Sequence, residues 1–264
     1  MDFDFSQIAV PFRMQPGLRR VAEHEVRLTP MESASRLYAE KRAVMEAGQS
    51  RHALPGFDPA PALRAIAARA ADAVPTHRQL PPELAFEEDF AVLDGVTGVL
   101  PWLCVCVPSH WAPEEKLGLD FASVHGPVAD NAALVAASKQ LVALATSGDC
   151  WERFVWTISP SPRHDQHPLR HARTPWPATA EPELFARQCW LRAERQVFFP
   201  VGQGTRQAVF AIRVMLQPLA QAVQAPGAAA RLHDSLASMS QAVLDYKGLS
   251  PARDRLLHWL ALSL

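Results

Sequence analysis

The sequence predicts an α+β fold, and three features of its hydrophobic pattern carry this prediction. Five short runs alternate between apolar and polar residues with the period of β-strands. Helical periodicity replaces that alternation between the second and third runs. It also dominates both ends of the chain. Antiparallel strands with helices inserted after the second strand are typical of a PAS-like domain. We therefore expect a single domain over residues 1–264, with an N-terminal helical extension (1–82), a PAS-like core built on a five-stranded antiparallel sheet (83–218) and C-terminal helices (219–264).

The composition indicates a soluble globular protein, since 48% of the 264 residues are hydrophobic and 20% are charged. A net charge of -1 without a basic cluster argues against nucleic acid and against an anionic membrane surface. The chain opens on acidic residues where a secretory signal would be basic, and its longest apolar run (99–107) is too short to cross a bilayer. We expect a cytoplasmic protein. Four cysteines without a Cys-x-x-Cys spacing indicate small buried residues rather than a zinc site.

Two helices are expected in the N-terminal extension. Thr29 and Glu32 form a capping box around a proline at the first helical position, which predicts a helix from Thr29 to Gly48. Asp58, followed by a proline, predicts the start of a second helix.

A hairpin is expected to open the sheet. Residues 86–93 and 100–107 read as strands, and the Asp-Gly pair at 94–95 is a turn signal between them. Two helices should follow, at 113–125 and at 132–146.

Three further strands complete the predicted sheet, at 151–158, 188–201 and 207–216. A proline-rich loop at 160–182 separates the first two of them, and a loop with two glycines joins the last two as a hairpin. Helical spacing returns beyond Pro218 and continues to the end of the chain.

His125 is the candidate ligand for a metal or a haem iron. It follows Phe121 by one helical turn, so its ring should project beside an apolar helix face. A neutral imidazole in such a place is a good iron ligand, because low solvent access protects the bond. The alternative is a histidine that interacts only with the carbonyl end of its helix.

Arg195 and Arg213 fall at apolar positions of the last two predicted strands. A guanidinium keeps its charge, so burial demands an anionic partner. A carboxylate of the protein would make each arginine part of a structural ion pair, whereas a carboxylate or phosphate of a ligand would make it a binding residue. Lys116, near the start of the helix that carries His125, is a less specific candidate whose alternative is a solvated surface lysine.

Six separated motifs carry a resemblance to a known family. They are Phe12-Arg-Met-Gln-Pro-Gly-Leu18, Glu88-Asp-Phe90, Pro108-Ser-His-Trp-Ala-Pro-Glu-Glu-Lys-Leu-Gly118, Val124-His-Gly-Pro-Val128, Arg192-Ala-Glu-Arg-Gln196 and Val209-Phe-Ala-Ile-Arg213. With these residues the chain resembles the haem-dependent oxidative N-demethylase α-subunit-like family, from about Phe12 to Leu219.

The resemblance implies a PAS-like domain that binds haem b through a histidine. By motif position this histidine is His125, and His110 is the second candidate. A haem propionate would then be the anion bound by Arg195 and Arg213, with Lys116 as a weaker contact.

The resemblance also implies an activity, because members of the family oxidise small secondary amines such as dimethylamine with dioxygen. Their electrons pass from NADPH through flavin and iron–sulfur partner proteins. This chain has neither a nicotinamide fingerprint nor a cysteine cluster, so a separate reductase subunit is expected. The resemblance leaves oligomer formation open.

The chain departs from the family pattern in two places. Ala129 stands where the family continues with proline. Phe198-Phe-Pro-Val201 stands where the family has a basic residue in a Leu-Pro context. These changes leave the substrate open. Two rival functions are a haem-based sensor or gas-binding module without turnover, and a structural protein without haem in which both arginines are internally paired.

Overall fold

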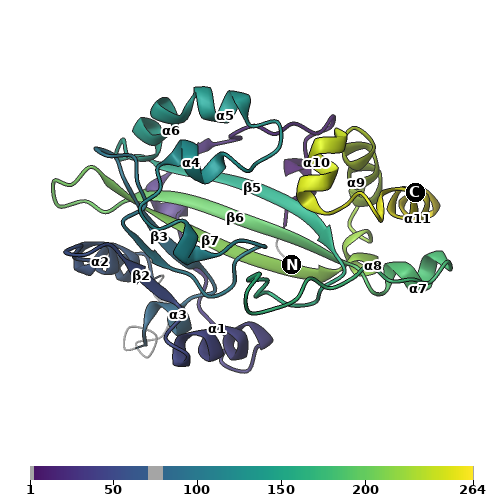
Figure 1. Ribbon diagram of the computed structural model, residues 1–264, viewed down its shortest axis with the longest axis horizontal. Coiled ribbons are helices and arrows are strands. Elements are labelled where there is room, and N and C mark those ends of the chain that lie inside the picture. Colours follow the sequence, from purple (N-terminus) through teal and green to yellow (C-terminus); the bar gives the residue numbers. More distant parts are fainter. Residues whose placement is uncertain (1–2, 71–79, 264) are drawn as a thin grey trace.

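A seven-stranded antiparallel sheet runs through the protein, whose computed structural model describes residues 3–70 and 80–263. The strand order is β1-β5-β6-β7-β3-β4-β2, so the two longest strands, β6 and β7, have neighbours on both sides (Figure 1). The strands are β1 (Arg19–Val21), β2 (Arg51–Ala53), β3 (Asp89–Asp94), β4 (Trp102–Cys104), β5 (Cys150–Ser159), β6 (Trp190–Pro200) and β7 (Gln207–Pro218).

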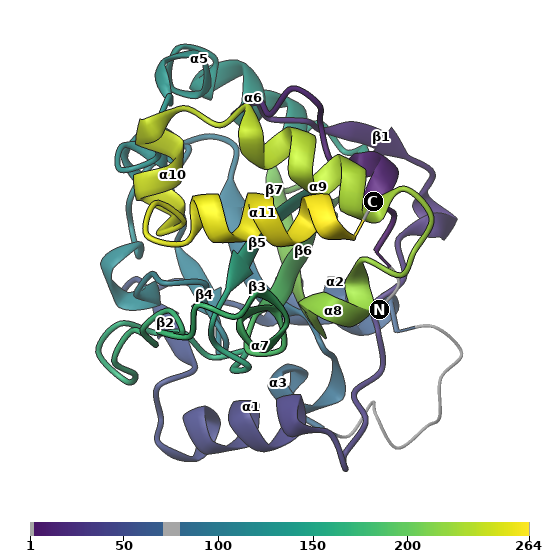
Figure 2. The same cartoon turned by 90° about the vertical axis from the view of Figure 1, so that its right-hand side faces the viewer.

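The helices form groups around the sheet (Figure 1). They are α1 (Arg36–Glu46), α2 (Ala60–Ala68), α3 (Pro82–Ala85), α4 (Phe121–His125), α5 (Ala132–Ala136), α6 (Ser138–Ala145), α7 (Pro182–Ala186), α8 (Leu219–Ala222), α9 (Ala228–Ala237), α10 (Gln241–Lys247) and α11 (Arg253–Leu262). Figure 2 shows α9 and α11 side by side across one end of the sheet. None of the helices in the described part of the chain has the length and apolar character needed to cross a membrane.

Side-chain alternation along β5 and β6 creates two distinct faces of the sheet. The cross-strand register places one set on a single face: Trp151, Arg153, Val155, Glu194, Gln196 and Phe198. Phe121 of α4 joins a hydrophobic cluster with Trp151 and Phe198, so we name this side the α4 face. On the opposite face, Leu191 and Ala193 are buried in the core that includes α9 and α11.

The α+β class is confirmed, but the described residues form seven strands rather than five. The five predicted strands are neighbours in the order β5-β6-β7-β3-β4, and the two additional strands, β1 and β2, lie at the edges. Each additional strand has only three residues, too few for an alternating pattern to be recognised in the sequence. They form because β5 and β4 offer backbone donors and acceptors to them.

The predicted helix start at Thr29 is wrong. The backbone N–H and the hydroxyl of Thr29 both donate to the buried carboxylate of Glu88, at about 3.0 Å. This long-range bond holds Thr29 outside a helix. The helix α1 begins only after Ser35, whose Oγ accepts from the N–H of Tyr38 at 3.0 Å.

The helices inserted between β4 and β5 are present, but each predicted one is divided. A 3₁₀ turn at Pro113–Glu115 precedes α4, and Gly118 between them has φ +72°, a conformation that ends a helix. Asp120 then caps α4 by accepting from the N–H of Ser123 at 2.7 Å. The second predicted helix is likewise divided into α5 and α6.

A buried lysine attaches α1 to the start of β3. The ammonium of Lys41 is fully buried, lies 3.0 Å from the Asp89 carboxylate and donates to three backbone carbonyls, those of residues 86 to 88. Asp89 also accepts from the N–H groups of Cys106 and Val107. A charge with this many partners is stable in the interior, but either partner alone is not.

We predict that Lys41→Met lowers the free energy of unfolding by about 3–5 kcal/mol, because it leaves the Asp89 charge buried without its cation. Urea unfolding of the purified protein measures this loss. The control is Arg42→Met at the neighbouring position, whose exposed ion pair with Glu46 should contribute no more than about 0.5 kcal/mol. Equal losses for the two variants would contradict the assigned role of Lys41.

Candidate functional site

The motif Arg192-Ala-Glu-Arg-Gln196 lies in β6 and distributes its charges over both faces of the sheet. Arg192, Glu194 and Gln196 share the α4 face, because alternate residues of a strand point to the same side. Arg195 lies on the opposite face.

Arg192 holds two loops against the sheet. Its guanidinium is buried and donates to Ser109 Oγ at 2.8 Å and to three backbone carbonyls, those of Val107, Arg163 and His164. Burial lowers the pKa of Arg192 to about 10, so the group stays charged at neutral pH. The loops after β4 and after β5 are therefore fixed at one end of the α4 face.

A chain of hydrogen bonds links Arg192 to Arg153 across this face. Ser109, held by Arg192, donates its hydroxyl to one oxygen of the Glu194 carboxylate. Gln196 Nε2 donates to the other carboxylate oxygen at 2.7 Å. The side-chain oxygen of Gln196 accepts in turn from Arg153 Nε, also at 2.7 Å. The charges of Glu194 and Arg153 are thus connected only through neutral groups.

Arg153 and Glu194 keep charge that is available to a ligand. In the described parts of the chain, neither group has an oppositely charged side chain within 4.0 Å. Both residues are partly exposed, as is Val155 between them on the same face. Burial lowers the pKa of Arg153, and the Glu194 carboxylate acts against this effect.

His125 is oriented by its own helix. Its Nδ1 lies 2.8 Å from the carbonyl oxygen of Phe121, which therefore accepts the Nδ1 proton. The imidazole also stacks on the Phe121 ring, with centroids 4.1 Å apart. Its Nε2 has no hydrogen-bond partner among the residues that the structure describes. This is the tautomer in which Nε2 offers a lone pair to a metal.

The surroundings of His125 favour the neutral imidazole. Burial lowers its pKa below the usual 6.5, and the positive charges of Arg153 and Lys116 act in the same direction. Lys116 and Arg153 are therefore near enough for their charges to act on His125.

Arg195 and Arg213 lie on the other side of the sheet, where they face each other across β6 and β7. Arg195 forms an ion pair with the buried Glu152 at 2.5 Å, and Arg213 pairs with Glu87 at 2.7 Å. The interpretation as structural ion pairs thus matches the observed contacts. Neither arginine is brought together with His125.

His110 belongs to a different part of the molecule. It lies in a loop with φ +60° and lines a cavity to which α4 contributes none of the described lining residues. Burial of the ring and the nearby Arg173 and Arg192 lower its pKa to about 4. The two candidate histidines therefore have different charged neighbours and do not form one site.

Residues 83–257 match the family described as haem-dependent oxidative N-demethylase, alpha subunit-like. This match covers well over half of the chain. The protein belongs to this N-demethylase family. The family description names a haem-dependent oxidative enzyme and an alpha subunit, which indicates one component of a larger assembly.

The N-demethylase match confirms the resemblance seen in the motifs but has different limits. It begins in α3, contains β3 to β7 and extends into α11, beyond the end expected at residue 219. Five of the six motifs fall inside it, whereas the segment 12–18 lies outside.

The sequence analysis did not single out Arg153 or Glu194 as site residues. The signal was present in the alternation of β5, where Arg153 stands between Trp151 and Val155 on the face that lacks Phe154 and Trp156. What the pattern lacked was the position of α4, which decides which of the two faces carries the site.

We predict that the haem-free protein loses stability as the pH falls below 6.5, in part because of His125. The folded-state pKa of His125 is below that of the unfolded chain, so the unfolded chain binds a proton first and is favoured by acid. Urea unfolding at several pH values should show that the free energy of unfolding falls less on acidification for His125→Gln than for the wild type. An NMR titration midpoint of His125 above 6.5 would contradict this prediction.

Proposed function

We propose that this protein binds haem b on the α4 face, where His125 would ligate the iron, and catalyses oxidative N-demethylation of a small secondary amine. The observation that carries the proposal is the orientation of His125, with Nδ1 bonded to Phe121 and Nε2 free among the described residues. The family match supports the same cofactor and reaction class.

The residues present fit a haem. A porphyrin supplies four ligands to its iron, so one histidine from the protein is sufficient. Among the described residues, no group of three or more His, Cys, Asp or Glu side chains is arranged to hold a metal ion. The chain has no Cys-x-x-Cys spacing, which supports haem b rather than a covalently attached haem.

Apolar side chains that would contact a porphyrin lie on the α4 face. Val155, Phe210 and Trp111 are only partly buried there. The order β5-β6-β7-β3-β4 with helices inserted after β4 supports a PAS-like core, in which the cofactor would lie between the sheet and α4.

Arg153 would pair with a haem propionate. It has no carboxylate partner of its own in the described structure, and it lies close enough to His125 to lower the pKa of that residue. Lys116, the other positive charge that acts on His125, would contribute a weaker contact. We therefore assign to Arg153 the role that the sequence pattern suggested for Arg195 and Arg213.

Glu194 would hold the substrate. A secondary aliphatic amine is a cation at neutral pH, and the Glu194 carboxylate receives hydrogen bonds only from neutral groups, Ser109 and Gln196. These two bonds fix the carboxylate without cancelling its charge, so it can bind an ammonium group and hold its proton. Haem, when bound, would supply the activation of dioxygen needed to oxidise an N-methyl group.

A separate reductase would supply the electrons. The sequence contains neither a nicotinamide fingerprint nor the cysteine cluster of an iron–sulfur protein. The designation of the family as an alpha subunit supports a partner of this kind. We propose a flavin- and iron–sulfur-containing partner that takes electrons from NADPH.

We predict that the purified protein takes up one haem and that His125→Ala abolishes this uptake, as measured by the Soret absorbance on titration. Arg153→Met should weaken haem binding about tenfold, since it removes a charge-assisted bond to a propionate. The matched control is Arg195→Met on the opposite face, which should lower stability without changing haem affinity. A larger loss of haem affinity in Arg195→Met than in Arg153→Met would place the haem elsewhere.

We further predict that the haem-loaded protein releases formaldehyde from dimethylamine when it is supplied with NADPH and a reductase. Glu194→Gln should raise KM by about tenfold or more, because the variant lacks the charge that binds the ammonium. Stoichiometric haem without formaldehyde from any secondary amine would instead favour a gas-binding module.

A further inference from the structure

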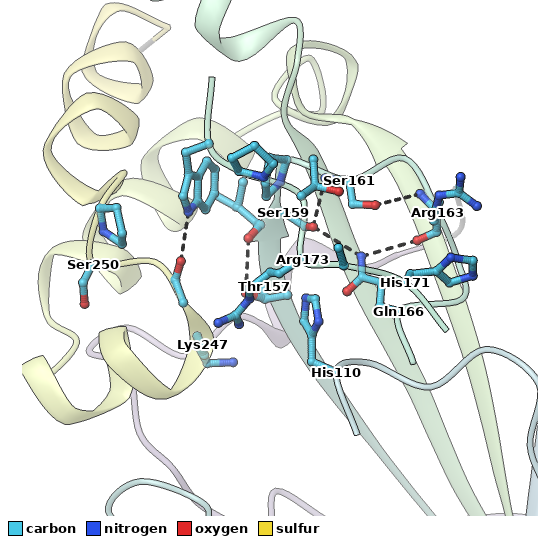
Figure 3. Close-up of a pocket in the computed structure, with 18 of the residues that line it drawn as sticks. His110, Thr157, Ser159, Ser161, Arg163, Gln166, His171, Arg173, Lys247 and Ser250 are labelled. Atoms are coloured by element: carbon cyan, nitrogen blue, oxygen red, sulfur yellow. Dashed lines mark hydrogen bonds between the residues drawn. The ribbon is translucent and has the colours of Figure 1, made fainter. Parts of the chain in front are cut away.

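A second candidate site occupies a cavity of about 400 Å³ at the C-terminal end of β5 (Figure 3). One wall is formed by the end of β5 and the loop that follows it, from Thr157 to Trp176. The other wall is the C-terminal end of α10 and the turn that leads to α11. No residue of α4 is among the described lining residues, so this cavity is separate from His125.

The cavity is lined by side chains of both charges. Of the two acids, Asp165 is paired with Arg170 and His171, whereas Asp245 accepts only from the neutral groups of Ser250 and Gln241 and keeps its charge. Arg173 has no carboxylate within 4.0 Å in the described part of the chain. Lys247 on the α10 side adds a second cation, which donates to a backbone carbonyl.

The guanidinium of Arg173 lies against Gly248. This glycine ends α10 with φ +67°, and a Cβ at this position would come within 2.6 Å of Arg173 Nη2. The guanidinium therefore occupies the space that a side chain would fill. The carbonyl oxygen of Gly248 also accepts from Trp176 Nε1 at 3.0 Å, which attaches the loop to the end of α10. Arg173 is exposed, and its guanidinium thus lies where the 157–176 segment meets the end of α10.

A buried acceptor completes the lining. Gln166 is 4% exposed, and its Nε2 donates to Ser159 Oγ and to the Arg163 carbonyl oxygen, at 3.3 and 3.4 Å. Its Oε1 has no partner among the described residues, and in Figure 3 it points to the side where His110 and Arg173 lie. A buried carbonyl oxygen without a donor is unfavourable, so a ligand with an N–H or O–H group would satisfy it.

We propose that this cavity binds a small carboxylic acid that carries a hydroxyl or amino group and an apolar body. Arg173 would bind the carboxylate through its fork of donors, with Lys247 adding positive charge. Gln166 Oε1 would accept from the hydroxyl or amino group. Trp176 and the prolines that line the cavity would contact the apolar part.

Calorimetric titration of the full-length protein with 3-phenyllactate tests this proposal. Saturable binding is expected, and 3-phenylpropionate, which lacks the hydroxyl, should bind about fivefold to tenfold more weakly. Arg173→Gln should weaken the binding of 3-phenyllactate about tenfold or more. The matched control is Arg163→Gln, whose side chain extends away from Arg173 in Figure 3 and should leave affinity unchanged.

A second variant separates recognition of the ligand's hydroxyl from recognition of its carboxylate. Gln166→Leu should bind the two acids with equal affinity. Absence of saturable 3-phenyllactate binding to the wild type at about 10 mM, or equal losses in Arg173→Gln and Arg163→Gln, would overturn the proposal. These measurements do not require haem, so their outcome is independent of the function proposed for His125.

Discussion

The buried guanidinium of Arg192 is the constraint on which both candidate sites depend. A charged group in the interior must have its donors satisfied, and Arg192 reaches this state only by binding Ser109 and three carbonyl oxygens from two separate loops. One loop thereby places Ser109 beside Glu194 on the α4 face. The other loop belongs to the 157–176 segment, which forms one wall of the second cavity. Within this motif, Arg192 is therefore a structural residue, whereas Glu194 keeps a charge that a ligand can bind.

The division of charges between the two faces of the sheet explains the chemistry of each. On the opposite face, Arg195 and Arg213 form ion pairs with Glu152 and Glu87, so these charges are neutralised within the protein. On the α4 face, Arg153 and Glu194 are kept apart by Gln196, which binds both. A direct ion pair between them would leave little charge for a ligand. The neutral amide between them keeps a cation and an anion available on the face that α4, the helix of His125, packs against.

Much of the architecture was visible in the sequence because it depends on local periodicity. The five predicted strands, the helices inserted after the second of them and the C-terminal helices all follow from sequence patterns that extend over six or more residues, although β4 itself has only three residues within the predicted run 100–107. Several errors come from competition with contacts distant in sequence. Thr29 is held out of a helix by Glu88, and β1 and β2 form because β5 and β4 offer them an edge to pair with. The division of the predicted helix 113–125 is instead local, at Gly118.

The sequence by itself determined the family, the fold class, the alternation that separates Arg195 from Glu194, and the position of His125 one turn after Phe121. These properties are set by neighbours a few residues away. Only the tertiary structure decided that α4 covers the face of Arg153 and Glu194 rather than that of Arg195 and Arg213. The reason is that periodicity assigns residues to opposite sides of a strand, but which side receives a given helix depends on how all the elements pack together.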